Sequence, residues 1–283
     1  MRSPSPTPAR VHAATSGVRY HPARGFIRQC YQSLVMANVN VRTDLDLDSP
    51  TLVEGLPGVG LVGKIATDHL VETFDMKLAA SVDCEGVPEV AVYDDDSRDV
   101  VPPLRIHADE SRDLLALQSD VPVARGNTSD FADCLTAWFE EHDVTPLYLS
   151  GLPDEDHEMG ELPRVFGIGS GAGVDILADH DIDTPPERGV VGGPTGALVN
   201  RAGDRDLDDV TLVVDSDPKF PDPAAARRLI DTGIAPITGV DVPTDDLVER
   251  AEEIREQKEQ LAQRMQDASE EESTQAKPMP MFQ

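Results

Sequence analysis

The sequence predicts an α/β fold in which helices cover both faces of a mixed β-sheet. Hydrophobic residues make up 39% of the 283-residue chain, which is enough to build a sizeable core. From Thr51 onward, short apolar runs of strand length alternate with segments whose apolar residues recur at helical spacing. Neighbouring runs between residues 78 and 118 have no helix between them, so we expect part of the sheet to be antiparallel.

The first half of this pattern places two helices among its strands. A strand over residues 51–54 leads into a glycine-rich segment, and a helix over residues 64–74 follows. A second helix begins after residues 127–130, whose side chains favour a helix N-cap, and packs apolar side chains from Phe131 to Phe139. The remaining expected strands are residues 78–82, 89–93, 101–107 and 114–118.

The second half continues the alternation. Proline at 221 and 223 flanks Asp222 and predicts the start of a helix over residues 222–230, because proline is tolerated in a first turn. The glycines of residues 167–173 either turn the chain or bring backbone amides to an anion at a helix start. The other expected elements are strands over 146–150, 165–169 and 211–214 and a helix over 195–201.

The two ends of the chain differ from this core, which we place at residues 37–243. Residues 1–36 contain five arginines and no acidic residue, and we expect a disordered basic extension or a start-site artefact. Residues 244–268 carry an apolar stripe and predict an amphipathic helix that docks on the domain or on a sister subunit. Residues 269–283 form a polar tail that we expect to be flexible.

The charge balance excludes several classes of partner. There are 53 acidic against 24 basic residues, a net charge of −29, so the protein repels nucleic-acid phosphates and anionic lipids. The longest uncharged stretch is too short to span a membrane. Many carboxylates with few lysines are typical of a halophilic, archaeal cytoplasm, because concentrated salt screens the self-repulsion.

Groups that could carry catalysis or bind metal are sparse. Cys30, Cys84 and Cys134 form neither a CxxC pair nor an even-numbered framework, which predicts a reducing cytoplasm and no zinc site. The histidines are scattered, and the acidic clusters are expected to be solvated loops. We therefore expect no metal, no cofactor and no catalytic residue.

The clearest motif is the glycine-rich segment after the first strand. Gly58, Gly60 and Gly63 match the dinucleotide fingerprint, and Asp83 follows at the distance of the acid that binds a ribose. A phosphate loop is excluded because Ile65 follows Lys64 where that loop needs a hydroxyl. In the other interpretation, which we favour, the glycines permit a tight turn and close packing. The segment's candidate ligand or motif residues are Gly55, Pro57, Gly58, Gly60, Gly63 and Lys64.

The stretch from Glu54 to Ala66 resembles the signature of the proteasome assembly chaperone 2 family, whose archaeal members are often labelled ATP-grasp-like. Residues 192–198 and 220–226 agree with the family in order and spacing, and the resemblance covers roughly residues 39–268. It implies a three-layer α/β/α sandwich similar to nucleoside phosphorylases but without their catalysis. It also implies self-assembly into a homo-oligomer and the proteasome core particle as partner.

The resemblance also gives a role to the end of the chain. Met281, Phe282 and Gln283 resemble the hydrophobic–tyrosine–any-residue terminus by which proteasome activators dock on the core, with phenylalanine in place of tyrosine. The missing hydroxyl implies docking that is weaker by about 1 kcal/mol per tail. The expected function is that of a non-enzymatic, cytoplasmic assembly chaperone or adaptor. The alternative is a nucleotide- or dinucleotide-dependent enzyme that uses residues 58–64.

Overall fold

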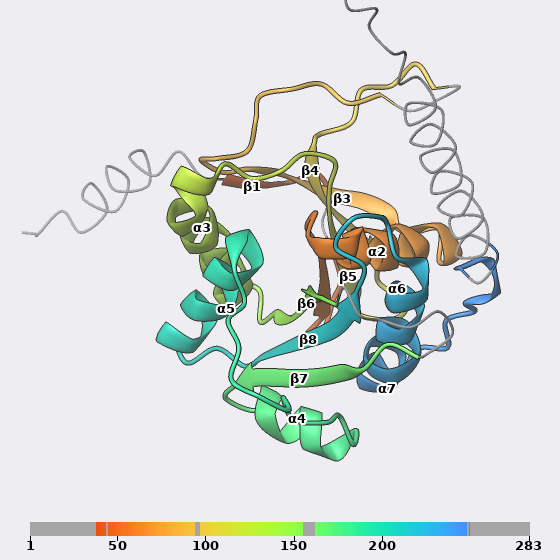
Figure 1. The fold of residues 1–283 in the computed structure, drawn as a ribbon. Coiled ribbons are helices and arrows are strands. Elements are labelled where there is room, and N and C mark those ends of the chain that lie inside the picture. Colours follow the sequence, from red (N-terminus) through yellow and green to blue (C-terminus); the bar gives the residue numbers. More distant parts are fainter. Residues whose placement is uncertain (1–37, 44, 94–96, 155–161, 248, 250–283) are drawn as a thin grey trace, which may run out of the picture. The chain divides into compact units, whose positions relative to one another are not determined.

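The computed structural model describes residues 38–43, 45–93, 97–154, 162–247 and 249. These residues form an eight-stranded sheet in the order β1-β3-β4-β5-β2-β6-β8-β7 (Figure 1). The strands are β1 (Asn38–Val41), β2 (Thr51–Gly55), β3 (Lys77–Asp83), β4 (Leu104–Asp109), β5 (Leu114–Ser119), β6 (Thr145–Pro153), β7 (Val165–Ser170) and β8 (Asp209–Ser216).

The sheet is mixed, as the sequence predicts. Its centre, β5-β2-β6-β8, is parallel, whereas β4 runs antiparallel to β3 and β5, and β7 runs antiparallel to β8. The connection from β4 to β5 is only a short turn, which permits no crossover and forces the two strands to be antiparallel. The parallel centre is covered on both faces, and all residues of β5 and β8 are buried.

Helices pack on both faces of the sheet (Figure 1). In β2, Leu52 belongs to the core under α3 and α5, whereas the next residue, Val53, belongs to the opposite core under α2, α6 and α7. The helical segments are η1 (Val59–Leu61), α2 (Val62–Thr73), η2 (Arg125–Asn127), α3 (Thr128–Glu141), α4 (Gly173–Asp179), α5 (Gly193–Asp204), α6 (Pro223–Leu229), η3 (Ile230–Ile234) and α7 (Ala235–Thr238).

One local prediction is wrong. Residues 89–93 form no strand: within this segment only Val92 pairs, in an isolated bridge to Val101, and prolines at 88, 102 and 103 remove donors that a ladder needs. The strand expected over residues 165–169 is confirmed as β7, so the first glycines of the segment 167–173 lie in this strand and the turn comes at Gly171. Here Gly169 lets β7 lie against β8, because a Cβ there would be 2.4 Å from the Asp209 carbonyl oxygen.

The expectation of reduced cysteines without a disulfide framework is also wrong. Cys84 follows β3, Cys134 lies on α3, and the two form a disulfide with a Cα–Cα distance of 6.3 Å. Their separation of 50 residues gives no local signal, and only the packing of α3 over this end of the sheet brings them together. Both are buried in the same core.

Several predicted segments lie outside the described residues. These are the extension over residues 1–36, the tail with Met281, Phe282 and Gln283, and most of the helix expected over 244–268. Residues 245–247 are helical, and Leu247 is fully buried in the core beneath α6. Within the described part of the chain, no helix combines the length and the apolar character needed to cross a membrane.

Breaking the Cys84–Cys134 disulfide is expected to destabilise the protein. Because the bond closes a loop over a separation of 50 residues, Cys134→Ser should lower the free energy of unfolding by about 4 kcal/mol. Urea unfolding of the oxidised protein and of the variant measures the difference. As the control, a reductant should destabilise the native protein but leave the variant unchanged. Finding three free thiols in the unreduced, denatured protein would contradict the pairing.

Candidate functional site

The glycine-rich segment lies where open α/β sheets usually bind ligands. Strands β2 and β5 are parallel neighbours, but the chain leaves β2 toward α2 on one face and leaves β5 toward α3 on the other. Such a switch point creates a crevice at the carboxyl ends of the strands. In this glycine loop, Gly55 ends β2, Pro57 and Gly58 form the turn, Gly60 lies in η1, and Gly63 and Lys64 lie in the first turn of α2.

The glycines of the loop permit close packing against the protein itself. Gly60 has a φ of +61°, and a Cβ there would lie 1.9 Å from Ser216 Oγ at the end of β8. The Gly60 carbonyl oxygen accepts a hydrogen bond of 2.8 Å from the Asp222 amide. Asp222 in turn caps α6, accepting from the Ala225 amide at 3.0 Å. The loop is thus joined to the segment that starts α6.

A buried carboxyl group joins the loop to α5. Glu54 is fully buried, and its Oε1 accepts hydrogen bonds from the Leu56 amide at 3.0 Å and from Thr195 Oγ1 at 3.1 Å. Its Oε2 accepts from the Leu149 amide of β6 at 3.2 Å. Burial raises the pKa of Glu54 to about 7, although the three hydrogen bonds act to lower it.

The three stretches that carry the family resemblance therefore meet at one place. Residues 54–66 contact residues 192–198 through Glu54 and Thr195, and contact residues 220–226 through Gly60 and Asp222. Sequence reasoning did not identify Glu54 as a site residue. The available signal was an acidic residue inside an otherwise apolar strand, where burial is costly unless the group is hydrogen-bonded.

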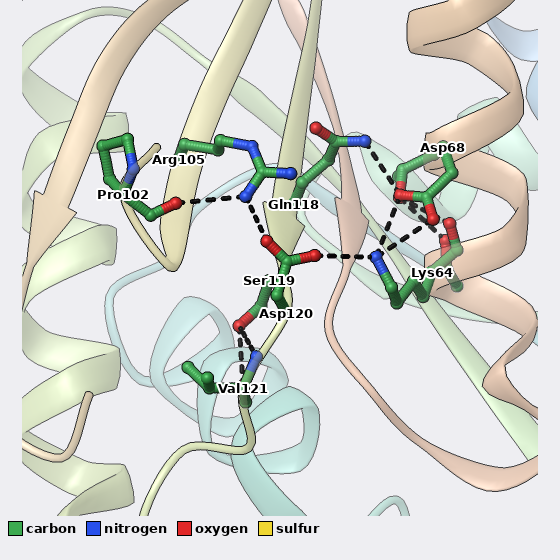
Figure 2. Close-up of polar contacts among 10 residues, drawn as sticks. Lys64, Asp68, Pro102, Arg105, Gln118, Ser119, Asp120 and Val121 are labelled. Atoms are coloured by element: carbon green, nitrogen blue, oxygen red, sulfur yellow. Dashed lines mark hydrogen bonds and ion pairs between the residues drawn. The ribbon is translucent and has the colours of Figure 1, made fainter. Parts of the chain in front are cut away.

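The Lys64 side chain forms ion pairs with acidic side chains of the same chain (Figure 2). Its Nζ lies 3.0 Å from Asp68 Oδ2 and 3.1 Å from Asp120 Oδ1. Asp120 also pairs with Arg105, whose guanidinium donates to the Pro102 carbonyl oxygen at 3.0 Å. Burial acts to raise the pKa of Asp120, but hydrogen bonds from Arg105 and Lys64 outweigh it and hold that pKa below its usual value.

The described residues give the loop a structural role more readily than a catalytic one. Asp83 ends β3, and β4 and β5 separate that strand from β2, so the structure does not bring Asp83 to the loop. Among the described residues, no group of three or more His, Cys, Asp or Glu side chains could hold a metal ion. In the second glycine-rich segment, residues 167–173, the Ala172 amide donates a hydrogen bond of 2.7 Å to Asp208 Oδ1 of the same chain.

Comparison with known proteins identifies relatives of this chain. A family model described as the PAC2 family matches residues 52–262. An uncharacterized protein of Methanocaldococcus jannaschii is 23% identical over 224 residues, which cover 78% of this chain and 89% of that protein.

Solved structures share the fold. PbaA of Pyrococcus furiosus, an archaeal homolog of proteasome-assembly chaperone, matches with a TM-score of 0.70 at 23% identity, covering 84% of this chain and 97% of PbaA. PbaB of the same organism, an archaeal proteasome activator, matches with a TM-score of 0.70 at 21% identity, covering 81% of this chain and 100% of PbaB. At these identities, the likeness establishes the α/β fold.

Replacing Gly60 tests the packing role of the loop. Gly60→Ala should lower the free energy of unfolding by at least about 2 kcal/mol, because alanine is strained at this φ and its Cβ displaces Ser216. Gly58→Ala is the matched control: Gly58 is extended and has nothing within 4 Å of a Cβ, so the change should stay below about 0.5 kcal/mol. Equal urea-unfolding midpoints for the two variants would contradict this role.

The ion pairs around Lys64 are expected to stabilise the fold. Asp120→Asn should cost about 1–2 kcal/mol at pH 7, because it weakens the bonds of two partly buried cations. The folded-state pKa of Asp120 is lowered, so its contribution is present at neutral pH and is lost as acid titrates it. Unfolding curves over a pH series measure this. The exposed Lys77–Asp75 pair supplies the control, and Lys77→Met should change stability by less than about 0.5 kcal/mol.

Proposed function

Because the chain belongs to the PAC2 family, we propose that it is a non-enzymatic, homo-oligomeric assembly chaperone or adaptor that engages the proteasome core particle in the cytoplasm. The family match over residues 52–262 is the observation that carries the proposal. The names of its structural relatives support it, since PbaA is an archaeal homolog of proteasome-assembly chaperone and PbaB is an archaeal proteasome activator.

The geometry of the glycine loop also supports a role without catalysis. Lys64 is paired with two carboxylates, and the Gly60 carbonyl and Glu54 carboxyl groups are bonded within the protein. A nucleotide-dependent enzyme would direct a lysine such as Lys64 to phosphate and would place an acid for the ribose. Lys64 pairs with Asp68 and Asp120, however, and β4 and β5 lie between the strand of Asp83 and β2. The loop instead holds β2, β8 and α5 in position relative to one another within one subunit.

Self-association is supported by apolar side chains on an acidic surface. Tyr93 and Val100, both in the excursion between β3 and β4, are 79% and 66% exposed, and Val190 before α5 is 94% exposed. Exposed apolar side chains indicate a protein-binding surface where they gather into a contiguous patch, and we propose that some of these side chains do so in the oligomer. At a net charge of −29, copies of the chain repel one another, so we propose that association takes place in concentrated salt, as in a halophilic archaeon.

For contact with the core particle we propose the terminal residues Met281, Phe282 and Gln283. An aromatic side chain and a terminal carboxylate would each occupy part of a pocket, and several tails on one oligomer would raise the effective concentration at a ring of pockets. This role rests on the resemblance of the terminal sequence to docking tails.

Deleting residues 281–283 is expected to abolish co-sedimentation with the purified proteasome core particle in concentrated KCl. Two point variants refine the test: Phe282→Ala should lose binding, because it removes the aromatic anchor. Phe282→Tyr should bind about fivefold more tightly, because it restores one hydrogen bond. Undiminished binding by the deletion variant would refute the tail contact. No binding by the full chain at any salt concentration would refute the proteasome partner itself.

A further inference from the structure

The last described residues begin a helix that contacts the core through one face. Residues 245–247 are helical, and Leu247 is fully buried in the core beneath α6, whereas residues 245, 246 and 249 are exposed. Just before this turn, His69 Nε2 of α2 donates a hydrogen bond of 2.6 Å to the Pro243 carbonyl oxygen. The helix therefore starts beside α2, with the face of Leu247 toward the protein.

The sequence of the helix predicted over residues 244–268 indicates which of its faces continues this contact. At about 100° per residue, Ala251 and Ile254 lie within about 40° of Leu247 around the helix axis. The five glutamates between residues 249 and 259 lie about 120° or more from Leu247. Three basic residues lie within about 80° of it, namely Arg250, Arg255 and Lys258. The face that continues from Leu247 is thus apolar and basic, and the opposite face is acidic.

A cavity of about 430 Å³ opens beside the C-terminal end of α2. It lies between the residues that follow α2, the start of β3 and the turn from β4 to β5. Its apolar lining includes Phe74, Met76 and Leu78, and Met76 belongs to the same core as Leu247. Phe74 comes five residues after His69, about 8 Å along the axis of α2. The cavity and the start of the terminal helix therefore lie near the same end of α2.

The rim of this cavity carries more acidic than basic side chains. Glu110 accepts a hydrogen bond of 2.9 Å from a backbone amide and forms no ion pair among the described residues. The other two carboxylates of the rim pair with its two cations, Asp75 with Lys77 and Asp109 with Arg112. One negative charge is therefore unbalanced at the opening, and a surface that is both apolar and basic would complement it.

We propose that the terminal helix docks in this cavity of its own subunit, with Ile254 inserted against Phe74 and Arg255 beside the rim carboxylates. Ile254 comes seven residues after Leu247, about 10 Å along a helix, which is comparable to the distance from His69 to the cavity. Because the helix is anchored at Leu247 of the same chain, its effective concentration at this cavity exceeds that of a helix from another subunit. The terminal tail over residues 269–283 then starts from one fixed face of the subunit, whether or not it contacts a proteasome.

Disulfide trapping tests which surface receives the helix. In a Cys30→Ser background, which leaves the native disulfide in place, Leu78→Cys and Ile254→Cys should form a bond within one chain under mild oxidation in concentrated KCl. Leu78→Cys with Glu256→Cys is the matched control, because residue 256 lies on the opposite face of the helix and should crosslink at least about tenfold more slowly. Equal rates at the two positions, or a bond between two subunits, would overturn the proposal.

Hydrogen–deuterium exchange of the full chain gives an independent readout without added cysteines. Ile254→Glu should expose the cavity, so amides of residues 74–78 and 108–112 should exchange about tenfold faster than in the native protein. Glu256→Ala, on the opposite face, should keep native rates in both segments, and β8 (Asp209–Ser216) should be unchanged in both variants. Native exchange rates around the cavity in Ile254→Glu would show that the helix does not dock there.

Discussion

The packing of β2, β6 and α2 around the glycine loop, which we call the central junction, depends on how closely these segments approach one another. A Cβ at Gly55 would lie 1.9 Å from Thr67 Oγ1, and a Cβ at Gly151 would lie 2.5 Å from the Val59 carbonyl oxygen. A side chain is excluded at both glycines, so β2 lies against the Thr67 side chain of α2, and β6 lies against the backbone of η1, more closely than a larger residue would allow. At these positions the chain packs against itself beside the switch point.

Two kinds of polar group complete this junction, and they differ in how their charge is balanced. Lys64, Asp120 and Arg105 form mutual ion pairs in which each charge has an opposite neighbour (Figure 2). Glu54 has only neutral donors, and burial therefore raises its pKa to about 7. The first arrangement pairs opposite charges, whereas the second places an ionisable group inside the fold with hydrogen bonds but no opposite charge.

Local sequence patterns predicted the elements that are marked by the spacing of their apolar residues or by the residues at their ends. The helical spacing before Phe74 predicts α2, and the sequence around Asp222 predicts the start of α6, where its side chain does cap the helix. The prediction over residues 89–93 is wrong, because strand propensity does not supply a pairing partner. The strand over residues 165–169 was predicted in spite of its glycines, which here allow close contact with β8.

The sequence by itself determined the alternation of strands and helices, the need for glycine after the first strand and the strongly acidic surface, because each is a property of neighbouring residues or of composition. Only the tertiary structure decided the strand order, the Cys84–Cys134 pairing and the meeting of Glu54 with Thr195. These contacts join residues 50 and 141 positions apart. They arise from packing of whole layers, which leaves no periodic trace in the chain.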